Sequence, residues 1–205
     1  PELDQPRFNV APTDPVAVVA TSRGGARRVG AMSWGLVPRW EKALRSRRLI
    51  NLRSETLLDR PGFRTALERR RCIVPADGFY EWKATGDGAR QPHFIRACDG
   101  RPLALAGLWD VWRDPAAGPD VDPLRTCTIL TTSPNEAMAR LHDRMPVVLA
   151  RDDWELWLDR SEDGAARLAG LLRPCPSEVL EVWPVGPAVN SVRNDGPHLI
   201  EPVAQ

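Results

Sequence analysis

The chain has 205 residues, of which 42% are hydrophobic and 27% are charged, and its formal net charge is +1. This length and composition fit a single globular domain over residues 1–205 and exclude a low-complexity chain. No apolar run approaches the roughly eighteen residues that a membrane span requires, and no signal peptide opens the sequence. We therefore expect a cytoplasmic protein that has no membrane partner.

Strands dominate the predicted elements. Short β-type runs predict strands at residues 16–20, 28–34, 72–83, 92–98, 103–112, 125–132 and 178–185. Turn sequences separate several of them, at Gly24-Gly25, at Thr85-Gly86-Asp87-Gly88 and at Asp99-Gly100. Because the last two turns join consecutive runs, the strands at 72–83, 92–98 and 103–112 are expected to form a meander.

Helices are fewer and short. Amphipathic spacing and start signals predict helices at residues 61–71, 134–141, 152–158 and 164–172. Ser133 and Glu136 have capping-box spacing, and Pro134 occupies the first helical position between them. Strands and helices follow one another without a regular βαβ alternation, which indicates an α+β fold built on antiparallel sheet.

The four cysteines do not form a recognisable metal or disulfide pattern. They lie far apart, at Cys72, Cys98, Cys127 and Cys175, without a CxxC pair, and three of them fall in apolar strand-like runs. This spacing favours buried thiols in a reducing compartment. Neither an HExxH motif nor a Cys/His cluster is present, so we expect no metal site.

Charge is spread unevenly along the chain. Between Arg39 and Arg71 there are eleven Lys/Arg against four Asp/Glu, a balance of +7, so the remainder carries −6. Such asymmetry suggests a basic face that suits a polyanion such as nucleic acid. The same count fits a solvated, arginine-rich helix face, so charge alone leaves both interpretations open.

Glu81 is the first candidate for proton transfer. In a strand, Phe79, Glu81 and Lys83 share one face, whereas Tyr80 and Trp82 point to the other. A carboxylate beside aromatic surface is desolvated, which raises its pKa toward the range useful in general acid–base catalysis. An edge-strand glutamate paired with a nearby cation fits the same spacing, and this alternative stays open.

His142 is the second candidate. It follows the predicted helix at 134–141 directly and lies at a helix-to-strand junction, where loop residues held by a scaffold often carry function. A histidine there can act as a general acid near neutral pH. It can equally be a structural residue that bonds a nearby carbonyl. His93 and His198 are interpreted as structural or surface residues.

Further side chains suit contacts with DNA. Asn51 and Arg53 point the same way in an extended segment, and arginine offers a planar fork to phosphate. Arg144 is a second candidate for phosphate. Most of the eight tryptophans should be core residues. Trp40 and Trp82, like Trp34, neighbour glycine, proline or charged residues, and an exposed indole can stack on an unpaired base.

Six segments of the chain together resemble the successive motifs of one family. They are Arg7–Pro12, Trp34–Pro38, Asn51–Thr56, Arg71–Trp82, Ala106–Trp109, and Thr131-Thr132 leading to His142–Pro146. In this order they resemble the SRAP family (SOS response-associated peptidases), which capture abasic sites in single-stranded DNA. The resemblance covers essentially Arg7 to Val203 and is specific in combination.

The resemblance implies a barrel-like, mainly antiparallel core with few helices, no cofactor, and a monomer that is associated with the nucleoid and takes part in DNA repair. By its motifs, Glu81 manages protons during Schiff-base formation and cross-link reversal, His142 assists opening of the deoxyribose ring, and Asn51 positions the attacking cysteine. Further positions of the family match the DNA-contacting residues Arg53, Trp82, Arg144 and Thr131.

One motif of the family departs in this sequence. SRAP proteins begin with Met-Cys-Gly-Arg, and the cysteine exposed by removal of Met attacks the DNA, whereas residue 1 here is Pro1. We expect the native chain to carry that segment, since the other motifs are intact; a degenerate family member is the alternative. Two further functions stay open, a non-covalent single-strand binder and a peptidase limited to processing its own N-terminus.

Overall fold

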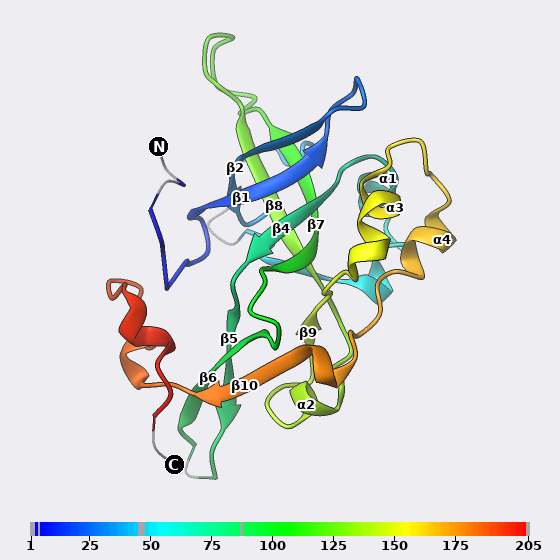
Figure 1. Cartoon of the computed structure of the whole chain (residues 1–205). Helices are drawn as coiled ribbons and strands as arrows, with labels where there is room; N and C mark the ends of the chain where they lie inside the picture. The colour runs from blue at the N-terminus through cyan, green and yellow to red at the C-terminus, as the bar shows by residue number, and fades with distance from the viewer. Residues whose placement is uncertain (1–2, 4, 45–47, 87, 204–205) are drawn as a thin grey trace.

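A five-stranded closed sheet forms the centre of the protein. The computed structural model describes residues 3, 5–44, 48–86 and 88–203 (Figure 1). The ring consists of β1 (Pro15–Thr21), β2 (Arg27–Trp34), β4 (Arg71–Ala76), β7 (Leu103–Trp112) and β8 (Leu124–Thr132), in the order β2-β1-β4-β7-β8. All neighbours are antiparallel except β2 and β8, which close the ring in parallel at Ser33 and Trp34. The expected α+β, barrel-like fold is therefore confirmed.

Two short strands extend this sheet beside the end of β8. β3 (Asn51–Arg53) runs parallel to β8, and β9 (Met145–Pro146) runs antiparallel to it. A second sheet contains β5 (Phe79–Ala84), β6 (Arg90–Ala97) and β10 (Leu180–Pro184), with β6 in the middle.

The helices are short and lie outside the barrel. They are α1 (Pro61–Arg69), α2 (Glu136–Ala139), α3 (Trp154–Leu158) and α4 (Ala165–Ala169), with 3-10 turns η1 (Ser54–Thr56), η2 (Arg151–Asp153), η3 (Ser177–Val179), η4 (Pro187–Asn190) and η5 (Pro197–Ile200). α1, α3 and α4 cover one side of the barrel, and α2 lies near the second sheet (Figure 1). No helix in the described part of the chain is long and apolar enough to cross a membrane.

The predicted meander is wrong. The run at 72–83 breaks after Ala76, so that β4 stays in the barrel beside β7 while β5 continues into the second sheet beside β6. Gly78 permits this crossing, because a Cβ there would lie 2.3 Å from a ring carbon of Phe94 and 2.5 Å from the carbonyl oxygen of Ile95. The β5–β6 hairpin itself forms as expected, although Asp87 of its turn lies outside the described residues.

Two helix predictions also need correction. Asn135, not Ser133, caps α2, since its Oδ1 accepts a hydrogen bond from the backbone N–H of Met138 at 2.9 Å. The helix therefore begins two residues later than a start at Pro134 and ends at Ala139. The helix predicted at 61–71 ends at Arg69, because Arg71 already belongs to β4.

The core consists of two large clusters and a smaller one. The first joins the barrel to α1, α3 and α4 around fully buried Trp157 and Leu67, and the second lies between the barrel and the second sheet. The third contains Phe94, Val185, Val189 and Leu199. Tyr80 and Trp82 pack against this third cluster, whereas Phe79 packs against the second, so the expected alternation along β5 is observed.

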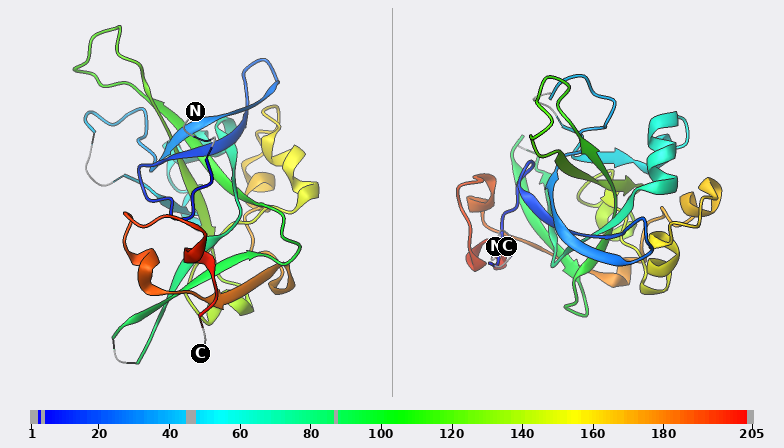
Figure 2. Two further views of the ribbon diagram at one scale, coloured as in Figure 1. Left: turned by 60° about the vertical axis from the view of Figure 1, so that its left-hand side comes forward. Right: turned by 90° about the horizontal axis from the view of Figure 1, so that it is seen from above.

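The N-terminal segment is bound to the C-terminal one beside the second sheet. Asn9 donates its side-chain amide to the carbonyl oxygens of Val189, Ser191 and Asn194 at 3.0–3.2 Å. The hydroxyl of Tyr80 on β5 donates to the carbonyl of Phe8 at 2.7 Å. The two terminal segments accordingly lie side by side in both further views of the chain (Figure 2).

Candidate functional site

The sheet brings together two of the segments that carry candidate site residues. β3 and β9 lie on opposite sides of the end of β8, where Thr131 is in register with Arg53 of β3 and with Pro146 of β9. The segment Asn51–Thr56 and the segment His142–Pro146 therefore meet at Thr131, although they are far apart in sequence. Thr131 itself is buried, and its hydroxyl lies 3.5 Å from the carbonyl oxygen of Leu52 on β3.

Glu81 of β5 lies next to His142, so a third segment of the chain reaches the same place. The Nδ1 atom of His142 lies 3.8 Å from Oε1 of Glu81, with the two side chains 41% and 23% exposed. This separation is longer than a direct hydrogen bond and short enough for a charge interaction when the imidazole is protonated. The two residues that the sequence offered independently as proton-transfer groups thus form one pair at the surface.

Glu81 lies in an environment that favours its protonated form. Burial raises the pKa of this carboxyl above its usual value, and the negative charge of Asp143 acts in the same direction. Protonated His142 and the backbone N–H of Trp82, 3.3 Å from Oε2, oppose the rise but do not cancel it. A glutamate of this kind can give and take a proton closer to neutral pH than an exposed one.

His142 is oriented by the turn that follows α2. Its backbone N–H donates to the carbonyl of Met138 at 2.9 Å, and Met138 is fully buried. The backbone N–H of Arg144 donates to Nδ1 of His142 at 3.1 Å, so neutral His142 carries its proton on Nε2. Asp143 Oδ1 lies 3.2 Å from the same Nδ1, where it can accept a hydrogen bond if Nδ1 is protonated.

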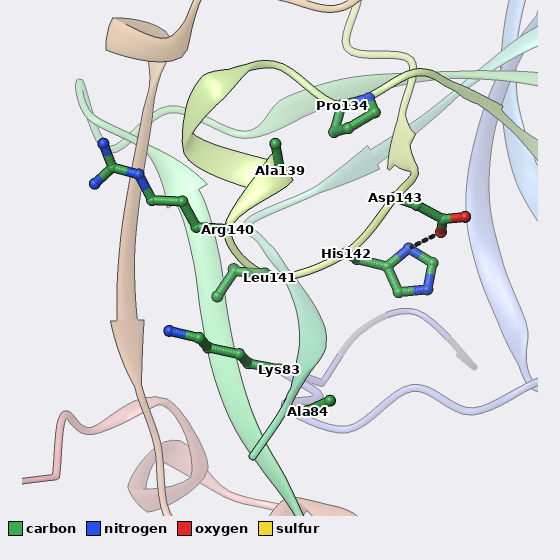
Figure 3. A pocket seen from close by; sticks show the side chains of 8 residues that line it. All are labelled: Lys83, Ala84, Pro134, Ala139, Arg140, Leu141, His142 and Asp143. Carbon is green, nitrogen blue, oxygen red and sulfur yellow. Dashed lines mark ion pairs between the residues drawn. The ribbon is translucent and has the colours of Figure 1, made fainter. Parts of the chain in front are cut away.

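An open depression adjoins this pair. It has a volume of about 550 Å³ and is lined by Lys83, Ala84, Pro134, Ala139, Arg140, Leu141, His142 and Asp143 (Figure 3). Its lining combines two cations with the apolar surface of the α2 turn. His142 and Asp143 lie together at one side of the depression, and Lys83 lies at another (Figure 3). Glu81 is two residues before Lys83 on β5.

Arg144 is occupied by a carboxylate. Its Nη1 and Nη2 atoms donate to Oε1 and Oε2 of Glu55, both at 2.7 Å, and Nη2 also donates to the carbonyl of Thr131 at 2.7 Å. Arg144 is 18% exposed and Glu55 52%. The hydrogen bonds to Arg144 lower the pKa of Glu55, so the pair is ionic near neutral pH. The predicted phosphate ligand is therefore not a free cation in this structure.

Asn51 and Arg53 do point the same way. Both are exposed and flank buried Leu52 on β3. Within the described part of the chain, neither side chain makes a hydrogen bond or an ion pair. Arg53 thus offers its whole guanidinium fork to a ligand, unlike Arg144, and Asn51 keeps both its donor and its acceptor available.

Trp40 and Trp82 differ in how much ring surface they expose for stacking. Trp40 is 49% exposed and packs edge-on against Phe63 at 5.7 Å. Gly62 makes this seat possible, since a Cβ there would lie 2.5 Å from the Trp40 ring. Trp82 is half-buried, and its indole N–H donates to Oδ1 of Asn190 at 2.7 Å, which fixes the ring. Trp40 has the geometry of a stacking platform, and Trp82 offers part of one face.

The basic segment between Arg39 and Arg71 contributes less free charge than its count suggests. Arg71 is buried and donates to five backbone carbonyls, and desolvation lowers its pKa to about 10. Arg70 is buried too, and Arg39 pairs with buried Asp110 at 2.7 Å. Arg45 and Arg47 lie outside the described residues. Of the nine described cations in this segment, Arg39, Arg70 and Arg71 are therefore held by contacts within the fold.

None of the cysteines lies in the site. Cys72, Cys127 and Cys175 are buried, and burial raises the thiol pKa of each. Cys98 is exposed but follows β6 five residues beyond His93, the cross-strand partner of Glu81, which places it about 16 Å along the strand. The thiols as a group are packing residues, apart from Cys98.

Sequence reasoning did not single out two residues of the site, Glu55 and Asp143. Glu55 lies within the motif Asn51–Thr56, and Asp143 lies within His142–Pro146. Spacing in the sequence did not indicate a role for either, because the elements around them are distant in the chain. His93 is directly opposite Glu81 on β6. That neighbour follows from the hairpin turn at Thr85–Gly88, which sets the register of the two strands.

Comparison with known proteins accounts for this arrangement of motifs. Residues 1–192 match the family described as "SOS response associated peptidase (SRAP)". The chain belongs to the SRAP family. The match covers the segments that contain Asn51, Glu81 and His142.

Named relatives span bacteria and vertebrates. The chain is 40% identical over 197 residues to abasic site processing protein YoqW of Bacillus subtilis (strain 168), covering 96% of this chain and 86% of that protein. It is 36% identical over 196 residues to abasic site processing protein HMCES of Gallus gallus, covering 84% of this chain and 56% of that protein.

A solved structure shares the fold. A Bacteroides thetaiotaomicron protein of known crystal structure superposes with a TM-score of 0.80 at 26% identity, covering 97% of this chain and 82% of that one. A second one, from Bordetella bronchiseptica, superposes with a TM-score of 0.72 at 26% identity over 86% of each chain.

Proposed function

We propose that this SRAP protein processes abasic sites in DNA, and that it does so by covalent capture within single-stranded DNA. The observation that carries the proposal is the Glu81–His142 pair at 3.8 Å, in which burial raises the pKa of the acid. Two proton-transfer groups that lie beside an open depression suit the attack of an amine on a sugar aldehyde. The relatives named abasic site processing proteins support the same substrate.

The chemistry requires a nucleophile that is not among the residues printed here. In the proposal it is an N-terminal cysteine in a Met-Cys-Gly-Arg segment, exposed by removal of Met. Its α-amine adds to the aldehyde of the ring-opened abasic sugar, and water leaves to give an imine. Its thiol then adds to the imine carbon while its proton moves to the nitrogen, which closes a thiazolidine.

The residues of this chain supply the protons for those steps. His142 protonates or deprotonates the sugar oxygens as the ring opens, and Glu81 transfers the protons of imine formation and of its reversal. Asn51 holds the cysteine with its free amide. Phe8 is bonded to Tyr80, the neighbour of Glu81 on β5. Tyr80 lies on the opposite face of β5 from Glu81, so in the proposal the segment before residue 8 passes this strand to reach the pair.

DNA contacts surround this centre. Arg53 binds a phosphate with its unoccupied fork, Trp40 stacks on an unpaired base, and Trp82 packs against the strand near the lesion. Thr131 and Arg144 lie beside the path, at the end of β8 between β3 and β9. A single strand is favoured, because stacking on Trp40 requires a base that is free of its partner. In this proposal the protein acts as a monomer on nucleoid DNA during the DNA-damage response.

Two other functions make different predictions. A non-covalent single-strand binder needs the arginines and tryptophans but not Glu81 and His142. A self-processing peptidase uses the pair to release residues from its own N-terminus, and the family name favours it. No described cysteine is both exposed and near the pair, so digestion of other proteins by a thiol of this chain is not part of the proposal.

A denaturing-gel assay tests the proposal. The protein with Met-Cys-Gly-Arg restored upstream is mixed with an abasic single-stranded oligonucleotide, and a band that survives denaturation is expected. Replacing the restored cysteine by alanine should remove that band and leave binding intact. A casein digest run in parallel tests general peptidase activity. Binding without any stable band would refute covalent capture and leave the non-covalent and self-processing functions.

A further inference from the structure

Arg144 has little to offer a phosphate while Glu55 is bound. A guanidinium carries five N–H donors. Both donors of Nη2 are used, by Oε2 of Glu55 and by the carbonyl of Thr131, and one donor of Nη1 is used by Oε1 of Glu55. The Nε atom is buried and has no hydrogen-bond partner among the described residues. One N–H therefore remains for a ligand, and a forked contact with phosphate is impossible in this arrangement.

Glu55 is the outer member of the pair. Its side chain is 52% exposed against 18% for Arg144, so a ligand that approaches from solvent meets the carboxylate first. It lies on η1, two residues after Arg53 of β3. A phosphate bound to Arg53 thus arrives beside a carboxylate that repels it and beside a guanidinium that attracts it. A carboxylate and a phosphate use the same fork of arginine.

The buried Nε atom of Arg144 has no hydrogen-bond partner among the described residues. A buried N–H of this kind without a hydrogen-bond partner carries an uncompensated desolvation cost. The present position of Arg144 is therefore held by Glu55 and Thr131 against that cost. A side chain held this way can exchange one strong acceptor for another with little further loss.

We propose that Glu55 is a built-in competitor for phosphate, and that DNA displaces its carboxylate from Arg144 when the strand is seated on Arg53. The proposal rests on the DNA-binding function above. The exchange makes tight binding depend on two phosphates at the spacing of Arg53 and Arg144, so isolated anions and poorly seated strands are rejected. The opposite possibility is that Glu55 only braces Arg144, in which case removing it weakens binding.

A double-mutant cycle on DNA affinity distinguishes Glu55 as a competitor for phosphate from Glu55 as a brace for Arg144. Fluorescence anisotropy with a labelled single strand carrying a stable tetrahydrofuran abasic analogue is measured at several salt concentrations. Glu55→Gln should tighten binding about threefold to tenfold and steepen the log–log salt slope by about 0.7, the value of one more phosphate contact. In an Arg144→Ala background the same substitution should give no gain, because no fork is released.

A matched control tests whether charge alone explains the gain. Glu155 also pairs with an arginine, Arg27, at 2.6 Å and is 89% exposed. It lies on α3, away from the site, so Glu155→Gln should leave affinity and slope unchanged. An equal gain from Glu55→Gln with and without Arg144 would mean simple loss of repulsion and would overturn the proposal. Weaker binding by Glu55→Gln at an unchanged Tm would overturn it in favour of a brace.

An NMR titration of the unsubstituted protein tests the displacement of Glu55 without a substitution that could disturb folding. Carboxyl 13C NMR of Glu55 is titrated with and without an abasic strand of thymidines, whose bases do not protonate in that range. Release from Arg144 should raise the pKa of Glu55 upon binding, and an unchanged pKa would contradict displacement. If the unsubstituted protein and every variant fail to bind any single strand, the DNA-binding function itself is refuted, a result distinct from binding that Glu55→Gln fails to tighten.

Discussion

Nδ1 of His142 lies 3.8 Å from Oε1 of Glu81, and the two residues reach this position from different parts of the fold. Glu81 comes from β5 in the second sheet, and His142 from the turn between α2 and β9. Burial and Asp143 raise the pKa of Glu81, whereas a charged His142 lowers it. The proton on Glu81 is therefore sensitive to a charge on the neighbouring imidazole.

The first prediction concerns the rate of capture. In the protein with its N-terminal cysteine restored, Glu81→Gln should slow cross-link formation or reversal by about 10²–10⁴. Affinity for abasic single strands should stay within a few fold, because the amide keeps the shape of the side chain. Single-turnover gels with anisotropy on the same samples measure both. A normal rate from the folded variant would remove Glu81 from the chemistry.

The second prediction concerns stability and pH. The raised folded-state pKa means that the folded protein prefers protonated Glu81. Below the unfolded pKa both states hold the proton, and as pH rises toward the folded pKa the unfolded state ionises first, so stability is lost. Glutamine has no proton to lose. Glu81→Gln should therefore melt above the unsubstituted protein at pH 7, and the difference should shrink near pH ~4.

Thermal melts at the two pH values, with Glu201→Gln as a control for an exposed carboxyl, check this prediction. A lower Tm for Glu81→Gln at neutral pH would mean that the carboxylate forms a stabilising contact in the folded protein.

The third prediction concerns His142. His142→Gln should also slow capture by about 10²–10⁴ on a natural abasic site. The loss should be smaller on an analogue whose aldehyde is already open, because ring opening is the step assigned to this residue. His198→Gln, far along the chain in η5, serves as the control. Equal losses on both substrates would assign His142 to a later step.

The fourth prediction concerns phosphate binding by Arg53. Arg53→Ala should weaken single-strand binding and flatten the log–log salt slope by about 0.7, the value of one phosphate contact to a single strand. Arg23→Ala, on the β1–β2 turn, is the control because its cation is on another part of the surface. An unchanged slope and affinity for Arg53→Ala would place this residue off the DNA path.

Local patterns predicted most of the strands because their signals are local. Turn glycines and alternation located β1, β2, the β5–β6 hairpin and the alternation of Phe79 and Tyr80 along β5. The meander failed because the crossing at Gly78 depends on how closely Phe94 and Ile95 approach, which only the packed sheets determine. The α2 cap failed because Asn135 and Ser133 both suit the position, and tertiary contacts of Asn135 with Cys175 decide between them.

The candidate site was predicted in part for the same reason. Asn51 and Arg53 share an exposed face, as a short extended segment requires. The pairing of Glu81 with His142 depends on how the second sheet lies against the barrel, and that of Arg144 with Glu55 depends on strand order around β8, so neither was available from spacing. The charge count overestimated the basic face, since burial of Arg70 and Arg71 is a property of the folded chain.

Intact-mass analysis of the restored protein with an abasic oligonucleotide tests the central claim most directly. Capture through amine and thiol joins protein and DNA with loss of one water. The account predicts an adduct of that mass under denaturing conditions, unchanged by borohydride, since a closed thiazolidine has no C=N bond to reduce. A gain of two hydrogens after borohydride would mean that the product stops at the imine. No adduct at all, from a protein that still binds the strand, would contradict covalent capture.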